Sequence, residues 1–121
     1  MLSIGSDFTP LERAVLAAIC EMYSKDRAAL EAQLSTATLL SRENTGAGFF
    51  THFEVHRASC TAIGGNRLRD GPEAKIDGLE NGMGFILWLK EGYANCLEGY
   101  SYAGSTTGII LEAASFEILQ G

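Results

Sequence analysis

The chain contains few of the residues that carry specialised chemistry or that cross-link small domains. It has two histidines, three cysteines, two prolines and one tryptophan in 121 residues. Cys20, Cys60 and Cys96 lie too far apart for a metal-knuckle or redox motif, and an odd number is atypical of a secreted disulfide framework. We therefore expect reduced, mostly buried thiols. No apolar run approaches the ~20 residues that cross a bilayer.

Basic residues are also scarce, with nine Lys and Arg against fifteen Asp and Glu and a net charge of -6. A protein that neutralises phosphates needs clustered Lys and Arg. The largest basic group, Arg57, Arg67, Arg69 and Lys75, is interrupted by acidic residues. Neither nucleic acid nor a membrane is therefore an expected partner. The first ten residues have no basic start and no long apolar core, so we expect no signal peptide and a cytoplasmic protein.

The length predicts a single domain over residues 1–121, long enough to bury a core without metal or disulfide. Thr9-Pro10-Leu11-Glu12 has the pattern of a capping box with proline at the first helical position. Apolar residues then recur at helical spacing to about Tyr23. Ser24 is the expected cap of a second helix that ends near Leu34.

Beyond the second helix the apolar period changes to two, which is typical of strands. The glycine-rich stretch 64–72 predicts a loop, and Lys90-Glu91-Gly92 predicts a hairpin turn. Residues 108–119 fit a final strand or a helix, and the pattern does not decide between them. The expected strands cover residues 36–41, 49–56, 74–76, 84–89 and 93–100.

Together these elements predict an α+β fold, with two N-terminal helices packed on a five- to six-stranded, mostly antiparallel sheet. Two helices can cover only one face of such a sheet, yet Phe50, Ile86 and Trp88 should point away from the covered face. An apolar second face needs its own cover. Either the sheet curves strongly into a half-barrel or it packs on a second copy, and we favour a homodimer. The covered face should hold Phe49, Phe53, Phe85, Leu87 and Leu89.

A short motif occurs twice, as ENTGAGFFTHF from Glu43 and as ENGMGFILWL from Glu80. In both places a Gly-x-Gly precedes an expected strand, whereas phosphate-binding glycine loops lead into a helix. Neither copy is therefore a nucleotide-binding signature. Glycines where a strand begins allow a bulge or a close backbone approach. One hypothesis is that the two strand starts lie side by side on paired strands.

His52, Glu54 and His56 form the most suggestive constellation for a metal, because alternate residues of a strand share one face. Two imidazoles and a carboxylate are suitable ligands for Zn, Ni or Fe. One flat strand is nevertheless a poor three-ligand site, and the Pro-Cys-x-x-Cys of zinc deaminases is absent. The competing interpretation is a solvated strand face, and we favour it and expect no cofactor.

Glu98 is the most interesting carboxylate for acid–base chemistry, because it lies among apolar and aromatic neighbours. Burial there would raise its pKa. The competing interpretation is a structural charge that is paired with Arg42 or capped by backbone amides. The aromatic residues of the expected hairpin could anchor a protein interface, line a small-molecule pocket or serve ordinary packing. They are Trp88, Tyr93, Tyr100 and Tyr102.

SRENTGAGFFTHFEV (41–55) and IDGLENGMGFILWLKEGYANCLEGYSY (76–102) resemble a family of small uncharacterised bacterial proteins. Its members share a Thr-Pro-Leu-Glu-type helix, a Gly-Phe-Phe-Thr segment and a Leu-Glu-Gly-Tyr-x-Tyr hairpin. The resemblance covers about two-thirds of the chain, implies a fold unit without a known activity, and suggests carriage on mobile gene cassettes. Members continue with acidic residues and Trp-Pro where this chain reads AGSTTGIIL, so the resemblance supports no C-terminal strand.

These observations favour a non-enzymatic module that recognises another protein, with an immunity or antitoxin-like role and a homodimeric state. Its contact surface would include Trp88, Tyr93, Tyr100 and Tyr102, together with the acidic C-terminal third of the chain. The alternative is a small-molecule- or metal-binding protein, or an enzyme, with a pocket near the aromatic hairpin. That pocket would use His52, Glu54, His56 and Glu98.

Overall fold

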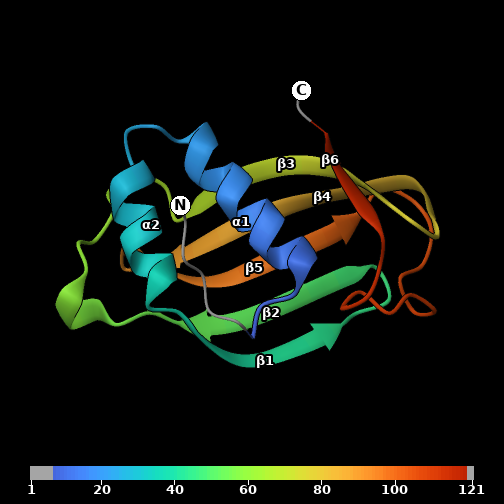
Figure 1. The fold of residues 1–121 in the computed structure, drawn as a ribbon, viewed down its shortest axis with the longest axis horizontal. Coiled ribbons are helices and arrows are strands. Elements are labelled where there is room, and N and C mark those ends of the chain that lie inside the picture. The colour runs from blue at the N-terminus through green and yellow to red at the C-terminus, as the bar shows by residue number, and fades with distance from the viewer. Residues whose placement is uncertain (1–6, 120–121) are drawn as a thin grey trace.

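The structure is a computed structural model that describes residues 7–119 (Figure 1). One six-stranded sheet, with every pair antiparallel, has the order β1-β2-β5-β4-β3-β6 and is not closed into a barrel. The predicted α+β class is confirmed. The elements are α1 (Pro10–Met22), α2 (Arg27–Ser35), β1 (Thr38–Asn44), β2 (Gly48–Glu54), the short 3-10 helix η1 (Arg57–Ser59), β3 (Leu68–Ile76), β4 (Leu79–Lys90), β5 (Tyr93–Ser101) and β6 (Phe116–Leu119).

Helix α1 begins as its sequence predicts. The Thr9 hydroxyl accepts a hydrogen bond from the Glu12 amide at 3.0 Å, and the Glu12 carboxylate accepts one from the Thr9 amide at 2.7 Å. This capping box satisfies two amides that a helix start leaves without partners. The buried stripe of the helix includes Val15, Leu16 and Ile19, which are fully enclosed.

Helix α2 begins later than predicted, and Ser24 is not its cap. The residue that precedes the helix is Asp26, whose side chain makes no capping bond. Its carboxylate instead pairs with Arg69 on β3, 3.2 Å from Nη2. The Asp26 carboxylate therefore serves a long-range ion pair and not a helix cap. Neither helix of the described chain has the length and apolar content to span a membrane.

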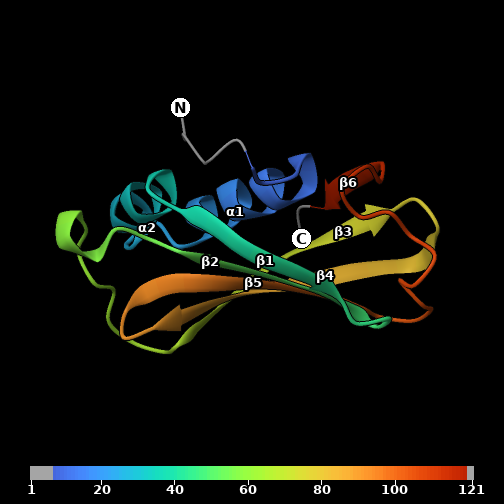
Figure 2. The same ribbon diagram turned by 90° about the horizontal axis from the view of Figure 1, so that it is seen from below.

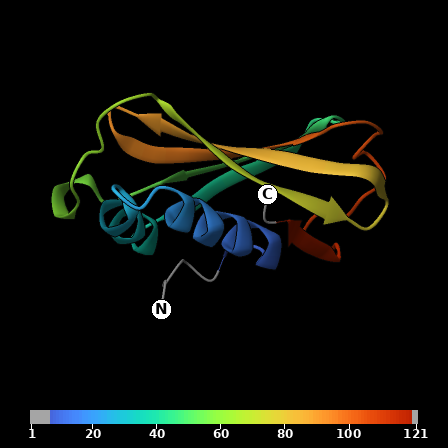
Figure 3. The same ribbon diagram turned by 90° about the horizontal axis from the view of Figure 1, so that it is seen from above.

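Both helices lie on one face of the sheet, and no helix or strand within residues 7–119 lies over the opposite face (Figures 2 and 3). The core fills the space between the two layers. As predicted, the alternation on β2 and β4 points one set of side chains into this core and the other set away from it. Among the inward side chains are Phe49, Phe53, Phe85, Leu87 and Leu89.

The repeated glycine motif precedes β2 and lies within β4, but the two segments are not paired. Strand β5 lies between β2 and β4, so the hypothesis of side-by-side strand starts is wrong. The two motifs instead flank one residue of β5, because Tyr100 is opposite Gly48 on β2 and opposite Gly84 on β4.

In the second half of the chain, one sequence prediction is partly wrong, and one alternative that the sequence left open is decided. The stretch 64–72 is not all loop, because β3 already begins at Leu68 and pairs along β4. Of residues 108–119, only 116–119 form a strand, β6, which pairs with β3. The preceding loop is anchored by the buried Thr106, which exchanges two hydrogen bonds with Asn44 at 2.7 and 2.8 Å.

Candidate functional site

The sheet face opposite the helices, called the open face below, is the largest candidate site. Cross-strand register arranges its side chains in three parallel rows, because residues directly opposite in an antiparallel pair project to the same face. The first row is Ser41, His52, Cys96, Trp88 and Leu68; the second is Glu43, Phe50, Glu98, Ile86 and Asp70; the third is Gly48, Tyr100, Gly84 and Glu73.

The composition of the open face is unusual for a solvent-facing sheet surface. Phe50, Ile86, Trp88 and Tyr100 are only partly buried, although no helix covers them. The three rows contain four carboxylates and no Lys or Arg. These three rows are therefore both apolar and acidic, and Arg67 and Lys90 lie at their edge beside Trp88.

The middle row, called the carboxylate row below, alternates carboxylate and apolar side chains across five strands. Glu43 of β1, Glu98 of β5 and Asp70 of β3 are separated by Phe50 and Ile86. Neighbouring strands lie about 4.8 Å apart, so successive carboxylates are about 10 Å apart.

Glu98 lies at the centre of the open face and does not pair with Arg42, which was the competing interpretation. Its Oε1 accepts a hydrogen bond from the Trp88 indole Nε1–H at 3.0 Å. Among the described residues Glu98 makes no ion pair. The indole fixes the orientation of this carboxylate without neutralising its charge.

Tyr100 and Tyr102 occupy the space that Gly84 leaves open. A Cβ atom at Gly84 would lie 2.5 Å from the Tyr100 hydroxyl and 2.7 Å from the Tyr102 hydroxyl. The two rings meet edge to face at 5.7 Å. Burial, then the nearby Tyr100 and Glu73, raise the pKa of Tyr102 to about 12. The second glycine motif thus makes room for an aromatic pair at one end of the open face.

His52, Glu54 and His56, considered above as a metal triad and judged the less favoured interpretation, do not come together in the structure. Strand β2 ends at Glu54, so His56 lies outside the strand, where its Nδ1 is 2.8 Å from the Ser59 hydroxyl. His52 lies on the open face with Nε2 3.5 Å from Glu43. Within residues 7–119, no three His, Cys, Asp or Glu side chains are grouped as metal ligands.

Tyr93 belongs to a separate contact at the β4–β5 turn. The Arg57 guanidinium lies 4.7 Å from the centre of the Tyr93 ring and pairs with Glu91 at 2.9 Å. These residues connect η1 to the turn. Tyr93 therefore belongs to the β4–β5 turn, apart from Trp88, Tyr100 and Tyr102.

A buried carboxylate on the helix side was not identified as a candidate from the sequence. Glu12 accepts hydrogen bonds from Nε and Nη2 of Arg42, both at 2.8 Å, and from the Thr51 hydroxyl. Burial alone would raise the pKa of Glu12, but the bonds from Arg42, Thr51 and the Thr9 amide outweigh it and lower the pKa. This saturated carboxylate holds α1 against β1 and β2.

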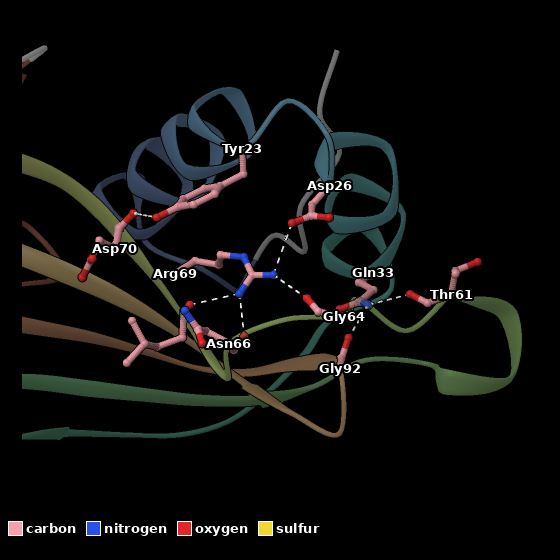
Figure 4. Close-up of polar contacts among 10 residues, drawn as sticks. Tyr23, Asp26, Gln33, Thr61, Gly64, Asn66, Arg69, Asp70 and Gly92 are labelled. Carbon is pink, nitrogen blue, oxygen red and sulfur yellow. Dashed lines mark hydrogen bonds and ion pairs between the residues drawn. The ribbon is translucent and has the colours of Figure 1, made fainter.

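A second buried polar cluster ties the helices to the long connection between β2 and β3 (Figure 4). The Arg69 guanidinium donates to the carbonyls of Gly64 and Asn66 and pairs with Asp26. Gln33 of α2 donates to the carbonyls of Thr61 and Gly92 at 2.8 and 3.0 Å. The hydrogen bonds of Arg69 and Gln33 therefore hold the helices and this connection together.

The cysteines are free, as expected, and two of them are buried. Desolvation by burial is the main cause that raises the pKa of both Cys20 and Cys96 to about 11. The thiolate is the nucleophilic form of cysteine. Neither thiol is therefore suited to nucleophilic chemistry near neutral pH.

None of the family models, curated proteins or solved structures compared with this chain matches it. The resemblance to small bacterial proteins noted in the sequence stays a prediction.

Proposed function

We propose that this protein is a non-enzymatic recognition module that binds another protein through the open face. The observation that carries the proposal is the partly buried set of Phe50, Ile86, Trp88 and Tyr100 on a face that no helix covers. Aromatic residues are enriched in protein interfaces, and Trp and Tyr are frequent anchors of binding energy. Large exposed apolar patches on soluble domains commonly mark such sites.

The polar groups on the helix side support a role without catalysis. The side chains of Glu12, Arg69 and Gln33 each make several hydrogen bonds to other groups of the protein. No described buried side-chain nitrogen or oxygen lacks a hydrogen-bond partner. A catalytic group needs hydrogen-bonding capacity that is free for the substrate, whereas these groups already use theirs in hydrogen bonds within the protein.

An immunity or antitoxin-like role fits this proposal, because such proteins act by occupying a partner surface. A homodimer would bury the same face and is the alternative form of the proposal. The rival function is small-molecule binding near the aromatic hairpin.

Affinity capture with matched variants tests the proposal. Phe50→Ala and Trp88→Ala remove apolar surface from the open face, whereas Met22→Ala and Ile110→Ala remove exposed apolar side chains elsewhere. We expect a partner bound by the wild type to be lost with the two open-face variants and retained with the two controls. Loss with all four variants, or with none, would contradict the proposal.

A thermal-shift screen against metals, nucleotides and metabolites tests the rival. A ligand at 100 times its dissociation constant adds about 2.7 kcal/mol to stability. For a domain of this size that is a shift on the order of 10 °C. Such a shift, if abolished by Glu98→Gln or Tyr102→Phe, would place a small-molecule site on the open face and refute the proposal.

A further inference from the structure

We infer that the open face binds a cationic amphipathic helix, which lies across the strands along the carboxylate row. This inference rests on the proposed function and names the class of partner. Three observations carry it: the spacing of the carboxylates, the apolar residues between them, and the lack of cations within the three rows.

The spacing of the carboxylate row matches the repeat of a helix. Glu43, Glu98 and Asp70 stand on every second strand, about 10 Å apart. Residues i and i+7 of a helix lie on one face about 10.5 Å apart, because the rise is 1.5 Å per residue. A helix with Lys or Arg at i, i+7 and i+14 can therefore meet all three carboxylates.

The positions of the apolar residues in the carboxylate row match the positions between the cationic residues of the same helix. Phe50 lies between Glu43 and Glu98, and Ile86 lies between Glu98 and Asp70. On the helix, positions i+3 and i+4 lie one turn along, midway between i and i+7. Apolar side chains there, and again at i+10 and i+11, would contact Phe50 and Ile86. The alternation thus specifies a pattern of cationic and apolar side chains.

Charge favours a cationic partner over a second copy of the chain. Within the described chain, Glu98, Asp70 and Glu73 make no ion pair, and the one charged or titratable partner of Glu43 is the His52 ring, 3.5 Å away. Arg67 and Lys90 lie at the edge of the open face beside Trp88. The rows themselves contain four carboxylates without a Lys or Arg, so two copies that meet row on row would oppose like charges at the centre of the contact. A cationic helix supplies the missing charge.

The neighbouring rows supply flat surfaces for long cationic side chains. Trp88 and Tyr100 flank Glu98 on either side, from the first and third rows. Lys and Arg bury their aliphatic stems on apolar surface and are attracted to aromatic faces. The Trp88 indole also orients the Glu98 carboxylate at 3.0 Å, so the central charge is preorganised.

Synthetic peptides test the inference directly. The probe is an alanine-based helical peptide of about fifteen residues, with Lys at i, i+7 and i+14 and Leu at the two intervening pairs. The matched control has the same composition with the lysines moved to the opposite helix face. We expect the probe to bind the full chain at least tenfold more tightly than the control, a difference of about 1.4 kcal/mol.

Binding is measured by the anisotropy of a labelled peptide at low and high salt. The fluorescence emission of Trp88, the single tryptophan of the chain, reports whether the peptide binds on the open face. A peptide that lacks aromatic residues should shift Trp88 emission, and its affinity should fall with salt because paired charges are screened. Equal binding of the two peptides, or binding without a change at Trp88, would overturn the inference.

Protein variants complete the test. Neutralising the carboxylate row with Glu43→Gln, Asp70→Asn and Glu98→Gln should lower the affinity for the probe peptide at least tenfold. Three exposed carboxylates outside the rows serve as the control and give the same change of net charge: Glu21→Gln, Asp77→Asn and Glu112→Gln. Equal effects of the two triple variants would show non-specific attraction and would overturn the inference.

Failure of the inference is distinguishable from failure of the proposed function. If the peptides do not bind but the Phe50→Ala and Trp88→Ala variants still lose a captured partner, the open face binds a partner of different chemistry. If the wild type sediments as a dimer and Phe50→Ala as a monomer, the occupant is a second copy. If neither experiment separates open-face variants from controls, both proposals fail.

Discussion

Phe49 and Phe50 are adjacent residues of β2 on opposite faces of the sheet. Replacing each by alanine tests whether the covered face stabilises the fold and the open face serves binding. Phe49 is 5% exposed and packs against Phe85, with ring centroids 6.2 Å apart. Its ring also lies over Gly99, where an added Cβ would be 2.3 Å from Cε2. Phe50 is partly exposed and stacks on His52 at 6.0 Å.

The expected losses of stability differ severalfold. Phe49→Ala leaves a cavity in a tightly packed core, which costs about 3–5 kcal/mol. Phe50→Ala gives up about half the burial of one aromatic side chain, or about 1 kcal/mol. For a domain of this size the difference corresponds to a melting temperature on the order of 10 °C lower for Phe49→Ala.

Urea unfolding of the two variants, followed by far-ultraviolet circular dichroism, measures both losses. We expect Phe50→Ala to keep nearly wild-type stability while it loses partner binding. If Phe50→Ala is as destabilising as Phe49→Ala, Phe50 belongs to a folding core, and the argument that the open face is kept for binding would be refuted.

Three further predictions concern the polar clusters and the aromatic pair. Because the folded-state pKa of Glu12 lies below its usual 4.5, its contribution to stability is present above that pH and is lost as pH falls through the folded pKa. The unfolding free energy of the wild type should therefore decrease more steeply from neutral pH to about pH 3 than that of Glu12→Gln; parallel curves would contradict this. Gly84→Ala should displace the phenol rings and lower the pKa of Tyr102 from about 12 toward 10, read from phenolate absorbance; an unchanged titration would show that the rings do not fill that space. Gln33→Leu removes three hydrogen bonds, including the one that its Oε1 accepts from the Ala94 amide at 2.9 Å, and should cost about 2–4 kcal/mol and speed hydrogen exchange at that amide; unchanged exchange would argue against the contact.

Short-range rules predicted the parts of the fold that depend on neighbouring residues. The capping box of Thr9 and Glu12 and the opposite faces of Phe49 and Phe50 follow from spacings of three and one along the chain. Both are confirmed because helix capping and strand pleating are local geometry. The predicted start of α2 at Ser24 is wrong, because residues 24–26 form a turn in which the Asp26 amide donates to the Tyr23 carbonyl at 2.9 Å, and the helix begins at Arg27.

Long-range pairing explains what the sequence could not predict about the site. The carboxylate row combines residues from five strands whose spatial order differs from their order in the chain. Asp70 fell in a stretch that the glycines marked as loop, so its place on β3 had no local signal. Trp88, Glu98, Tyr100 and Tyr102 were identified as candidates, and Phe50 and Ile86 were placed on the uncovered face with Trp88. The register that aligns them with Glu43 and Asp70 became known only with the strand order.

The most direct test of the open face as a binding surface is site-specific photo-crosslinking. A photo-reactive phenylalanine analogue is placed at Phe50, and in separate proteins at the exposed Met22 and Ile110. The account predicts a discrete protein adduct from position 50 in extract of the source cells, and none from positions 22 and 110. No adduct from position 50, or the same adducts from all three positions, would contradict it.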